Sequence, residues 1–181
     1  MNDTRNILRM PATLYRLLWT HLLPRNNNRE QAAFLFCRMR ADGDQTVFDV
    51  CEARFLKEGD FAVQAGDYLE LADETRISII KRAHALGACV AEFHSHPGPF
   101  PAAFSLSDRQ GLSETVPHMR WRLDRRPYLA VVVAPKNFDA LVFADDSGVP
   151  APLTGILLAD PLQRPTNASL EGWNERDRIT V

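Results

Sequence analysis

Residues 92–108 read EFHSHPGPFPAAFSLSD. His94 and His96 are two positions apart, so in a β-strand their side chains point to the same face. A proline and a glycine follow directly and end the strand, which predicts that the two histidines lie at an edge of a sheet. A loop rich in proline and apolar residues then leads to Ser-Leu-Ser-Asp at 105–108. The stretch therefore predicts a strand, a stiff loop and the beginning of a helix.

Asp108 allows two interpretations. With Ser105 as N-cap, it forms an acidic version of the capping box, and a carboxylate at a helix N-terminus is stable without a metal. For His94 and His96 alone, two half-exposed histidines at a strand end are the simpler interpretation, because short motifs match by chance. Two imidazoles and one carboxylate, however, leave a fourth tetrahedral position free for water, as in a catalytic zinc site. The helix start so close behind the histidines favours the metal site.

A hydrolytic zinc site also needs a general base near the nucleophilic water. Glu30, Glu52 and Glu92 are the candidates. Glu92 is in phase with the two histidines on the same strand face. Glu30 begins the apolar segment EQAAFLF and is expected at the edge of the core. The residue types alone do not choose between them.

The composition is that of an ordinary globular protein of 181 residues, with 45% hydrophobic and 24% charged residues. A net charge of −2 provides no basic field for nucleic acid. No apolar run approaches the roughly 20 residues that span a bilayer, and the N-terminus has no apolar signal core. Cys37, Cys51 and Cys89 lack CxxC spacing and are expected to be buried and reduced. We therefore expect a cytoplasmic protein with neither nucleic-acid nor membrane partners.

Hydrophobic periodicity predicts a mixed α/β (α+β) fold, in which helices flank a mixed β-sheet. The expected helices are 12–23, 73–86 and 105–119. The expected strands are 32–39, 46–56, 88–96, 127–135 and 138–145, with a short strand near 68–71. Residues 1–150 are expected to form a single domain. The proline-rich segment 151–181 is expected to be a peripheral tail.

HSHP, followed by a loop and SLSD, resembles the JAMM motif of the JAB1/MPN/Mov34 metallopeptidases. That motif is an upstream Glu, then His-x-His-Pro, a short loop and Ser-x-x-Asp. The resemblance covers roughly residues 12–145, is strongest to bacterial JAB-type members, and implies an MPN/JAB domain with cytidine-deaminase-like topology. The loop is one residue longer than in the common form, so a strict register would put Phe104 in place of the serine and Ser107 in place of the aspartate. The intact SxxD triplet favours a one-residue insertion instead.

The resemblance implies a role for each residue of the motif. His94, His96 and Asp108 would bind Zn²⁺, and Ser105 would stabilise the oxyanion. Glu30 would be the general base, because the catalytic Glu of the family begins a strand well upstream of the histidines.

The resemblance also implies a substrate class, namely amide or isopeptide bonds at the C-terminus of ubiquitin-like proteins. E1-like and E2-like proteins would be further partners. We expect the loop 98–104 and the segment 56–71 to form the walls of the substrate groove. The alternative is a catalytically silent MPN-like scaffold, against which the complete set of motif residues argues. A zinc deaminase would need HxE and PCxxC, and the sequence has neither.

Overall fold

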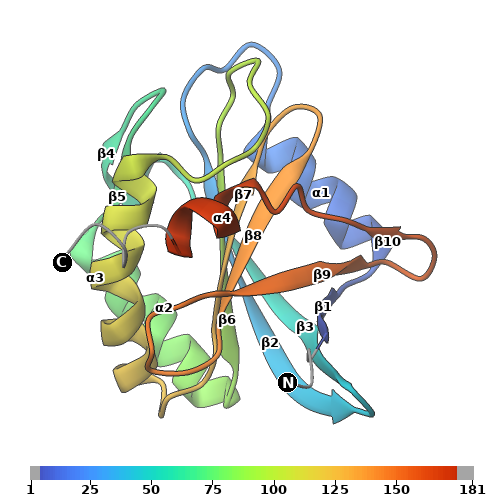
Figure 1. Ribbon diagram of the computed structural model, residues 1–181. Coiled ribbons are helices and arrows are strands. Elements are labelled where there is room, and N and C mark those ends of the chain that lie inside the picture. Colours follow the sequence, from blue (N-terminus) through green and yellow to red (C-terminus); the bar gives the residue numbers. More distant parts are fainter. Residues whose placement is uncertain (1–4, 175–181) are drawn as a thin grey trace, which may run out of the picture.

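The computed structural model describes residues 5–174, which form a mixed α/β fold (Figure 1). The helices are α1 (Ala12–Leu22), the 3₁₀ turn η1 (Glu58–Asp60), α2 (Asp73–Leu86), α3 (Leu106–Arg122) and α4 (Ala168–Asn174). The strands are β1 (Arg5–Arg9), β2 (Ala32–Asp42), β3 (Gln45–Phe55), β4 (Phe61–Gln64), β5 (Leu69–Leu71), β6 (Cys89–Ser95), β7 (Tyr128–Val133), β8 (Phe138–Phe143), β9 (Ala151–Leu157) and β10 (Leu162–Gln163).

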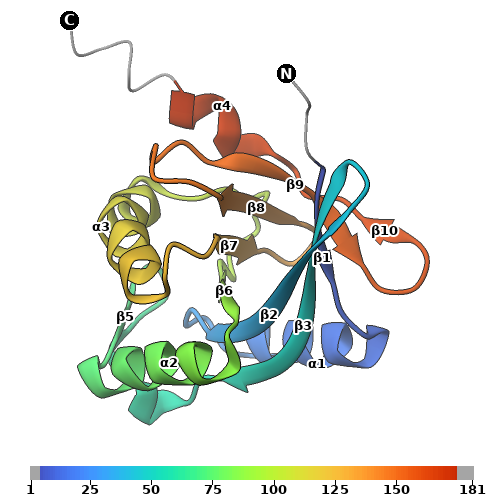
Figure 2. The same cartoon turned by 90° about the horizontal axis from the view of Figure 1, so that it is seen from below.

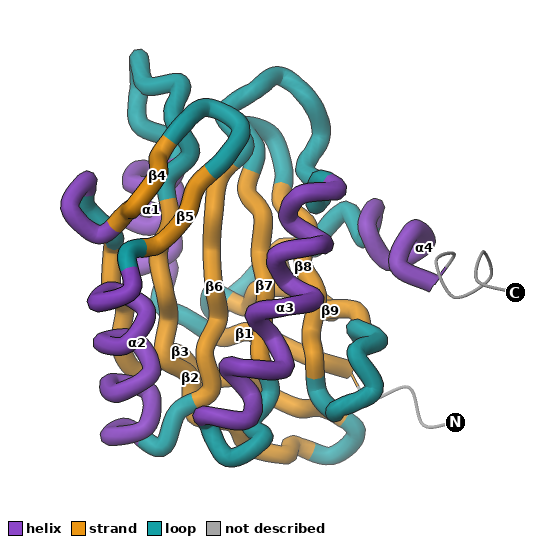
Figure 3. Tube along the Cα trace, turned by 90° about the vertical axis from the view of Figure 1, so that its left-hand side faces the viewer, coloured by secondary structure: helices purple, strands orange, loops and turns teal. Residues whose placement is uncertain are grey.

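One large mixed sheet forms the centre of the fold, with strand order β1-β3-β2-β6-β7-β8-β9-β10. β1 also pairs with β9, so the sheet closes on itself. The pairs β1–β3, β1–β9 and β6–β7 are parallel, and the other pairs are antiparallel. Helices α2 and α3 cover one side of the sheet and α1 covers the other, as Figures 2 and 3 show. The predicted mixed sheet flanked by helices is confirmed.

The first half of β2 is buried on both sides, because each side of the sheet packs against a helix layer. Phe34 and Phe36 belong to the core beneath α2 and α3. Ala33 and Leu35, which point the other way, belong to the core beneath α1. A continuous apolar run in the sequence is therefore the expected pattern for this strand.

The helices and strands predicted from periodicity are all present, with ends shifted by a few residues. Helix α3 runs past Pro117 to Arg122, further than predicted. Periodicity did not predict β1, β4, β10 or α4, which are short elements with little room for a repeating pattern.

The prediction of a peripheral tail after residue 150 is wrong for residues 151–157. This segment is β9, which lies between β1 and β8 in the sheet. Its Leu153 and Ile156 are fully buried. Prolines are disfavoured inside a sheet, so the prolines in this segment argued against a strand, but Pro152 is close to the end of β9, next to its first residue. Residues 175–181 lie outside the described part of the chain.

Two further expectations concern the cysteines and the membrane. Cys37 and Cys89 are buried free thiols as predicted, whereas Cys51 is exposed. Cys51 lies in the second half of β3, where the residues are half-buried or exposed. Between residues 5 and 174, no helix combines the length and the apolar character needed to cross a bilayer.

Candidate metal centre

The end of β6 and the start of α3 bring His94, His96 and Asp108 together. Nε2 of His94 lies 3.2 Å from Nε2 of His96 and 3.4 Å from Oδ1 of Asp108. Nε2 of His96 lies 3.2 Å from Oδ2 of Asp108. His94 is 5% exposed, so water has little access to the imidazole that lies deepest.

These separations suit a tetrahedral ion. Ligand atoms about 2.0–2.1 Å from a tetrahedral zinc ion are roughly 3.3 Å from one another. The two imidazole nitrogens are 3.2 Å apart, which is close to that value, and each of them lies 3.4 or 3.2 Å from a different oxygen of Asp108. Among the described residues, these three form the group of His, Cys, Asp and Glu side chains whose ligand atoms all lie within 4.8 Å of one another. The group could hold a metal ion with a fourth position left for a further ligand.

Asp108 also belongs to a capping box, so both interpretations of this residue hold at once. Its amide donates to Oγ of Ser105 at 3.1 Å, and its Oδ2 accepts from the amide of Ser105 at 2.7 Å. The capping box orients the carboxylate toward the histidines. Ser107 is exposed and is not part of the group. The placement of Asp108 agrees with a one-residue insertion in the loop.

Glu30 lies beside this group without being one of its members. Its Oε1 is 3.5 Å from Nε2 of His96, and the residue is 4% exposed. Its main chain is held from β4 and the turn after it, because its amide donates to the carbonyl of Ala65 and its carbonyl accepts from Nε2 of Gln64. At Gly66 a Cβ atom would lie 2.8 Å from the carbonyl oxygen of Asn28, so the close approach of these two segments requires glycine.

Ser95, between the two histidines, ties β6 to the segment that carries Glu30. Its Oγ accepts from the amide of Gln31 at 2.9 Å, and its own amide donates to the carbonyl of Gln31 at 3.0 Å. Ser95 is fully buried. The strand alternation that sends the histidines toward the metal site therefore sends Ser95 to the other face, where it fixes the neighbouring chain.

Charge and burial act in opposite directions on these side chains. Burial alone would lower the pKa of His94, but the hydrogen bond and charge of Asp108 outweigh it and raise that pKa above its usual value. Burial alone would raise the pKa of Asp108, but the hydrogen bonds of His94 and His96 lower it well below its usual range. Burial raises the pKa of Glu30, although the two histidines partly oppose the rise. A carboxylate with a raised pKa suits proton transfer near neutral pH.

The other two glutamates considered as a base have different surroundings. Glu52 pairs with Arg82 on the exposed side of β3. Glu92 accepts a hydrogen bond from the hydroxyl of Tyr128, and burial raises the pKa of Glu92. Since Glu52 and Glu92 are both bound to other side chains, Glu30 remains the carboxylate that directly adjoins a histidine of the group.

A cavity of about 360 Å³ adjoins the metal-binding group. Its walls come from β2, β6, α2, α3 and residues 67–71, which include β5. Figure 3 shows α2, α3 and β5 on the same side of the large sheet. The polar residues that line it include Glu30, Asp67, Glu70, Arg76, Glu92, His94, Asp108, Glu114 and Tyr128. The cavity offers a substrate a predominantly acidic approach to the site.

Fold and site together define a class, a mixed α/β protein with a His-His-Asp group of metal-binding type. A family model described as prokaryotic homologs of the JAB domain matches residues 11–143, and the chain belongs to this family. Comparison with the curated proteins finds no match. The match confirms the resemblance to bacterial JAB-type proteins.

The sequence predicted the three residues that the structure brings together, but not the residues that hold their segments in place. Ser95 and Gln64 bond to the segment around Glu30, and neither has a local sequence signal. The same applies to Ser169, whose Oγ accepts from the amide of Phe104 in the loop before α3. Contacts of this kind arise only when distant segments meet.

Proposed function

We propose that this protein is a zinc-dependent hydrolase of amide or isopeptide bonds at the C-terminus of ubiquitin-like proteins. One observation carries the proposal: a buried glutamate, Glu30, lies 3.5 Å from His96 of the three-residue group that could hold a metal ion. A structural metal site needs four protein ligands and no neighbouring base. Three ligands beside a base are the arrangement of a hydrolase.

The donor set of two imidazoles and one carboxylate fits Zn²⁺, with His94, His96 and Asp108 as its ligands. Zinc, when bound, supplies Lewis acidity and lowers the pKa of water toward about 7. Glu30 takes the proton of the attacking water and passes it to the leaving amine. Its raised pKa favours the protonated form that makes the second transfer. Ser105 Oγ, which accepts from the Asp108 amide, keeps its own hydrogen for the developing oxyanion.

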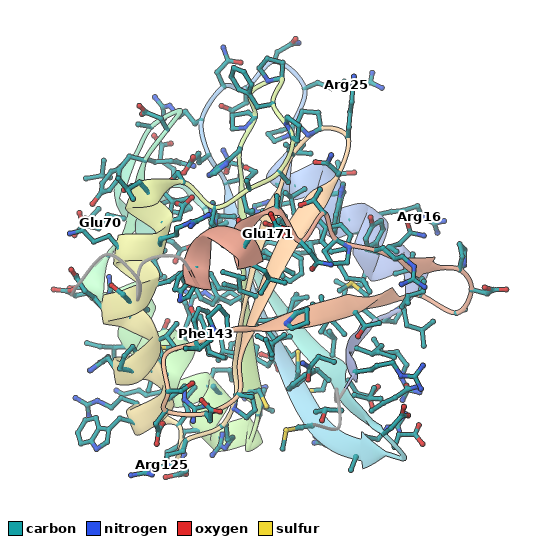
Figure 4. The ribbon with its side chains drawn as sticks, in the orientation of Figure 1. Arg16, Arg25, Glu70, Arg125, Phe143 and Glu171 are labelled. Atoms are coloured by element: carbon teal, nitrogen blue, oxygen red, sulfur yellow. The ribbon has the colours of Figure 1, made fainter. Side chains whose placement is uncertain are left out.

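The cavity beside the site suits an extended peptide tail. Residues 67–71, which include β5, line it, and β4 and β5 form a small sheet separate from the large one. An extended chain can add to such a sheet by main-chain hydrogen bonds. Glu70 of β5 is exposed, lines the cavity and lies toward the left-hand edge of Figure 4. The hairpin β4–β5 therefore serves as one wall of the substrate groove, within the predicted segment 56–71. E1-like and E2-like proteins remain proposed partners.

The test combines metal analysis with cleavage. Zinc per chain is measured for wild type, His96→Ala, Asp108→Ala and Glu30→Gln, alongside cleavage of fusions to the C-terminus of ubiquitin-like proteins. We expect close to one zinc in wild type and Glu30→Gln, and loss of zinc in the other two. Cleavage should occur with wild type only, because Glu30→Gln removes the base and leaves the ligands in place. Zinc-loaded wild type that cuts none of these fusions would overturn the proposal.

A silent scaffold that binds ubiquitin-like or E1/E2-like partners is the second candidate. The location of Glu30 argues against it, since burying a carboxylate costs free energy that a binding surface does not require. Cleavage by wild type distinguishes the two candidates. A scaffold would bind the fusion equally well as wild type and as Glu30→Gln, and neither protein would cut it, whereas a hydrolase would cut it as wild type.

A further inference from the structure

The loop before α3 is held by residues that are distant in the sequence. The amide of Ala102 donates to Oδ1 of Asn137 at 2.7 Å, and its carbonyl accepts from Oγ1 of Thr166 at 3.0 Å. The amide of Phe104 donates to Oγ of Ser169 at 2.8 Å. Two residues just before the N-cap of α3 thus have their main-chain groups fixed by the β7–β8 turn and by the segment that leads into α4.

Ser169 is itself fixed by a buried carboxylate. Its amide donates to Oδ2 of Asp139 at 2.9 Å, and Oδ1 of Asp139 accepts from the amide of Ala140. Asp139 and Ser169 are both 0% exposed. A buried carboxylate that accepts two amide hydrogen bonds is satisfied and rigid. Asp139 and Ser169 therefore connect β8 to Phe104 through hydrogen bonds between buried residues.

Helix α4 also contacts α3 and β8 directly. The ring of Trp173 lies 5.5 Å from that of Phe143, which is buried and is labelled below α4 in the view of Figure 4. The guanidinium of Arg109, on the first turn of α3, lies 6.0 Å from the centre of the Trp173 ring. Nε of Arg109 in turn donates to the carbonyl of Phe104. The segment 166–173 thus contacts both the loop and the helix that carries Asp108.

Phe104 connects the loop to the candidate metal centre. It is 3% exposed, and its ring lies 5.8 Å from the ring of His94 in an edge-to-face arrangement. The next residue, Ser105, is the N-cap of α3 and forms the capping box with Asp108. A shift of Phe104 would therefore move the Asp108 carboxylate and the packing of His94 together.

We propose that Asp139, Ser169 and Thr166 are positioning residues for the metal centre, which hold the loop 102–104 so that Asp108 stays within ligand distance of His94 and His96. The proposal builds on the metal site of the proposed function but not on the substrate. Ser169 and Thr166 lie beyond residue 143, where the family match ends. A segment of the chain that the match does not cover thus completes the site.

The test measures zinc affinity by competition with a chelator of known affinity, for wild type, Thr166→Val, Ser169→Ala and Asp139→Asn. Thr166 is exposed, so Thr166→Val removes one hydrogen bond to the loop with little risk to folding. Asp139→Asn retains the shape but accepts with one oxygen, so one of the two amides loses its acceptor. We expect each variant to bind zinc about tenfold more weakly, the lower end of the range for residues that orient metal ligands.

The matched control is Ser113→Ala, which removes an exposed hydroxyl on α3 bonded only to the carbonyl of Gln110. It should leave zinc affinity unchanged. Ser169→Thr retains the hydroxyl and should restore part of the affinity lost in Ser169→Ala, which a loss of global stability would not explain. Near-UV circular dichroism at the temperature of the titration checks that each protein is folded.

Unchanged zinc affinity in folded Thr166→Val and Ser169→Ala would overturn the positioning role, whether or not wild type cleaves a fusion. Wild type that takes up no zinc would overturn it as well, together with the metal site. Weaker zinc binding in the variants, with no cleavage by wild type, would support the positioning role and count against the proposed hydrolase alone.

Discussion

Oε1 of Glu30 lies 3.5 Å from Nε2 of His96, although the two residues flank different strands and are far apart in the sequence. The strand β2, which follows Glu30, pairs with β6, which precedes His96, and Ala32 is opposite His94 in the register. The position of the proposed base is therefore a consequence of strand pairing. A one-residue slip of this register would turn the side chains of one strand to the other face and separate the two groups.

This placement predicts different outcomes for Glu30, which is buried, and Glu92, which is half-buried. Glu92→Gln should retain zinc and most of the cleavage activity, because Glu92 is bound to Tyr128 and does not pair with a histidine of the site. Glu30→Gln should lose at least about 10²-fold in kcat, as expected for a general base. Steady-state cleavage of one fusion by both variants makes the comparison. A larger loss in Glu92→Gln than in Glu30→Gln would assign the base to Glu92.

The two roles of Ser105 can be separated by substitution. Ser105→Ala should lower the free energy of unfolding by about 1 kcal/mol through loss of the N-cap, whereas Ser105→Gly should cost only a few tenths. Both variants lack the hydroxyl, so both should lose about 10²–10³-fold in kcat if it stabilises the oxyanion. Urea unfolding and cleavage rates measured on the same preparations test this. If kcat instead falls in Ser105→Ala but hardly in Ser105→Gly, in parallel with the loss of stability, Ser105 acts only as the helix cap.

The two phenylalanines of the site loop should respond differently. Phe104 is 3% exposed and packs on His94, so Phe104→Ala should lower the free energy of unfolding by about 3–5 kcal/mol. Phe100 is 78% exposed, so Phe100→Ala should change it by less than about 0.5 kcal/mol. Chemical denaturation of the metal-free proteins makes the measurement. If cleavage nevertheless falls in Phe100→Ala while zinc binding stays intact, Phe100 contacts the substrate.

The stability of the metal-free protein should depend on pH through His94 and Asp108. The pKa of His94 is raised in the folded state, so its contribution is complete below about 6.5, its unfolded value, and is lost as the pH rises through the folded value. The pKa of Asp108 is lowered, so its contribution is present above about 3.9 and is lost as the pH falls through the folded value. Both contributions are therefore present between roughly pH 4 and 6.5.

The comparison of wild type with Asp108→Asn isolates this pair. The variant retains an oxygen that can accept from the amide of Ser105, so the helix cap is matched. The measurement is the free energy of unfolding of both metal-free proteins, in the presence of a chelator. The amount by which wild type is more stable than the variant should be larger at pH 5 than at pH 8.5. With zinc the trend should reverse for wild type, because neutral imidazole binds the metal and zinc therefore stabilises more as the pH rises. An equal difference at the two pH values would contradict the coupling.

Most of the secondary structure and the candidate metal-binding group could be predicted from the sequence, because both depend on local spacing. Helix α2 ends at Gly87, which adopts a left-handed conformation, as the glycine after an amphipathic segment predicts. His94 and His96 share a face because strands alternate, and Asp108 follows a helix cap. The strand β9 could not be predicted in the same way, since its burial depends on β1 and β8, which come from opposite ends of the chain.

The amino-acid sequence by itself determined which groups can form the candidate site. Two imidazoles, a carboxylate and a serine follow one another at intervals that a strand, a loop and a helix cap turn toward one another. The tertiary structure decided which glutamate joins them and what holds the loop in place. Glu30 reaches His96 through the pairing of β2 with β6, and Ser169 reaches Phe104 through the docking of α4 against β8. Local spacing fixes the direction of a side chain, but the distance between two segments depends on how the whole sheet closes and packs.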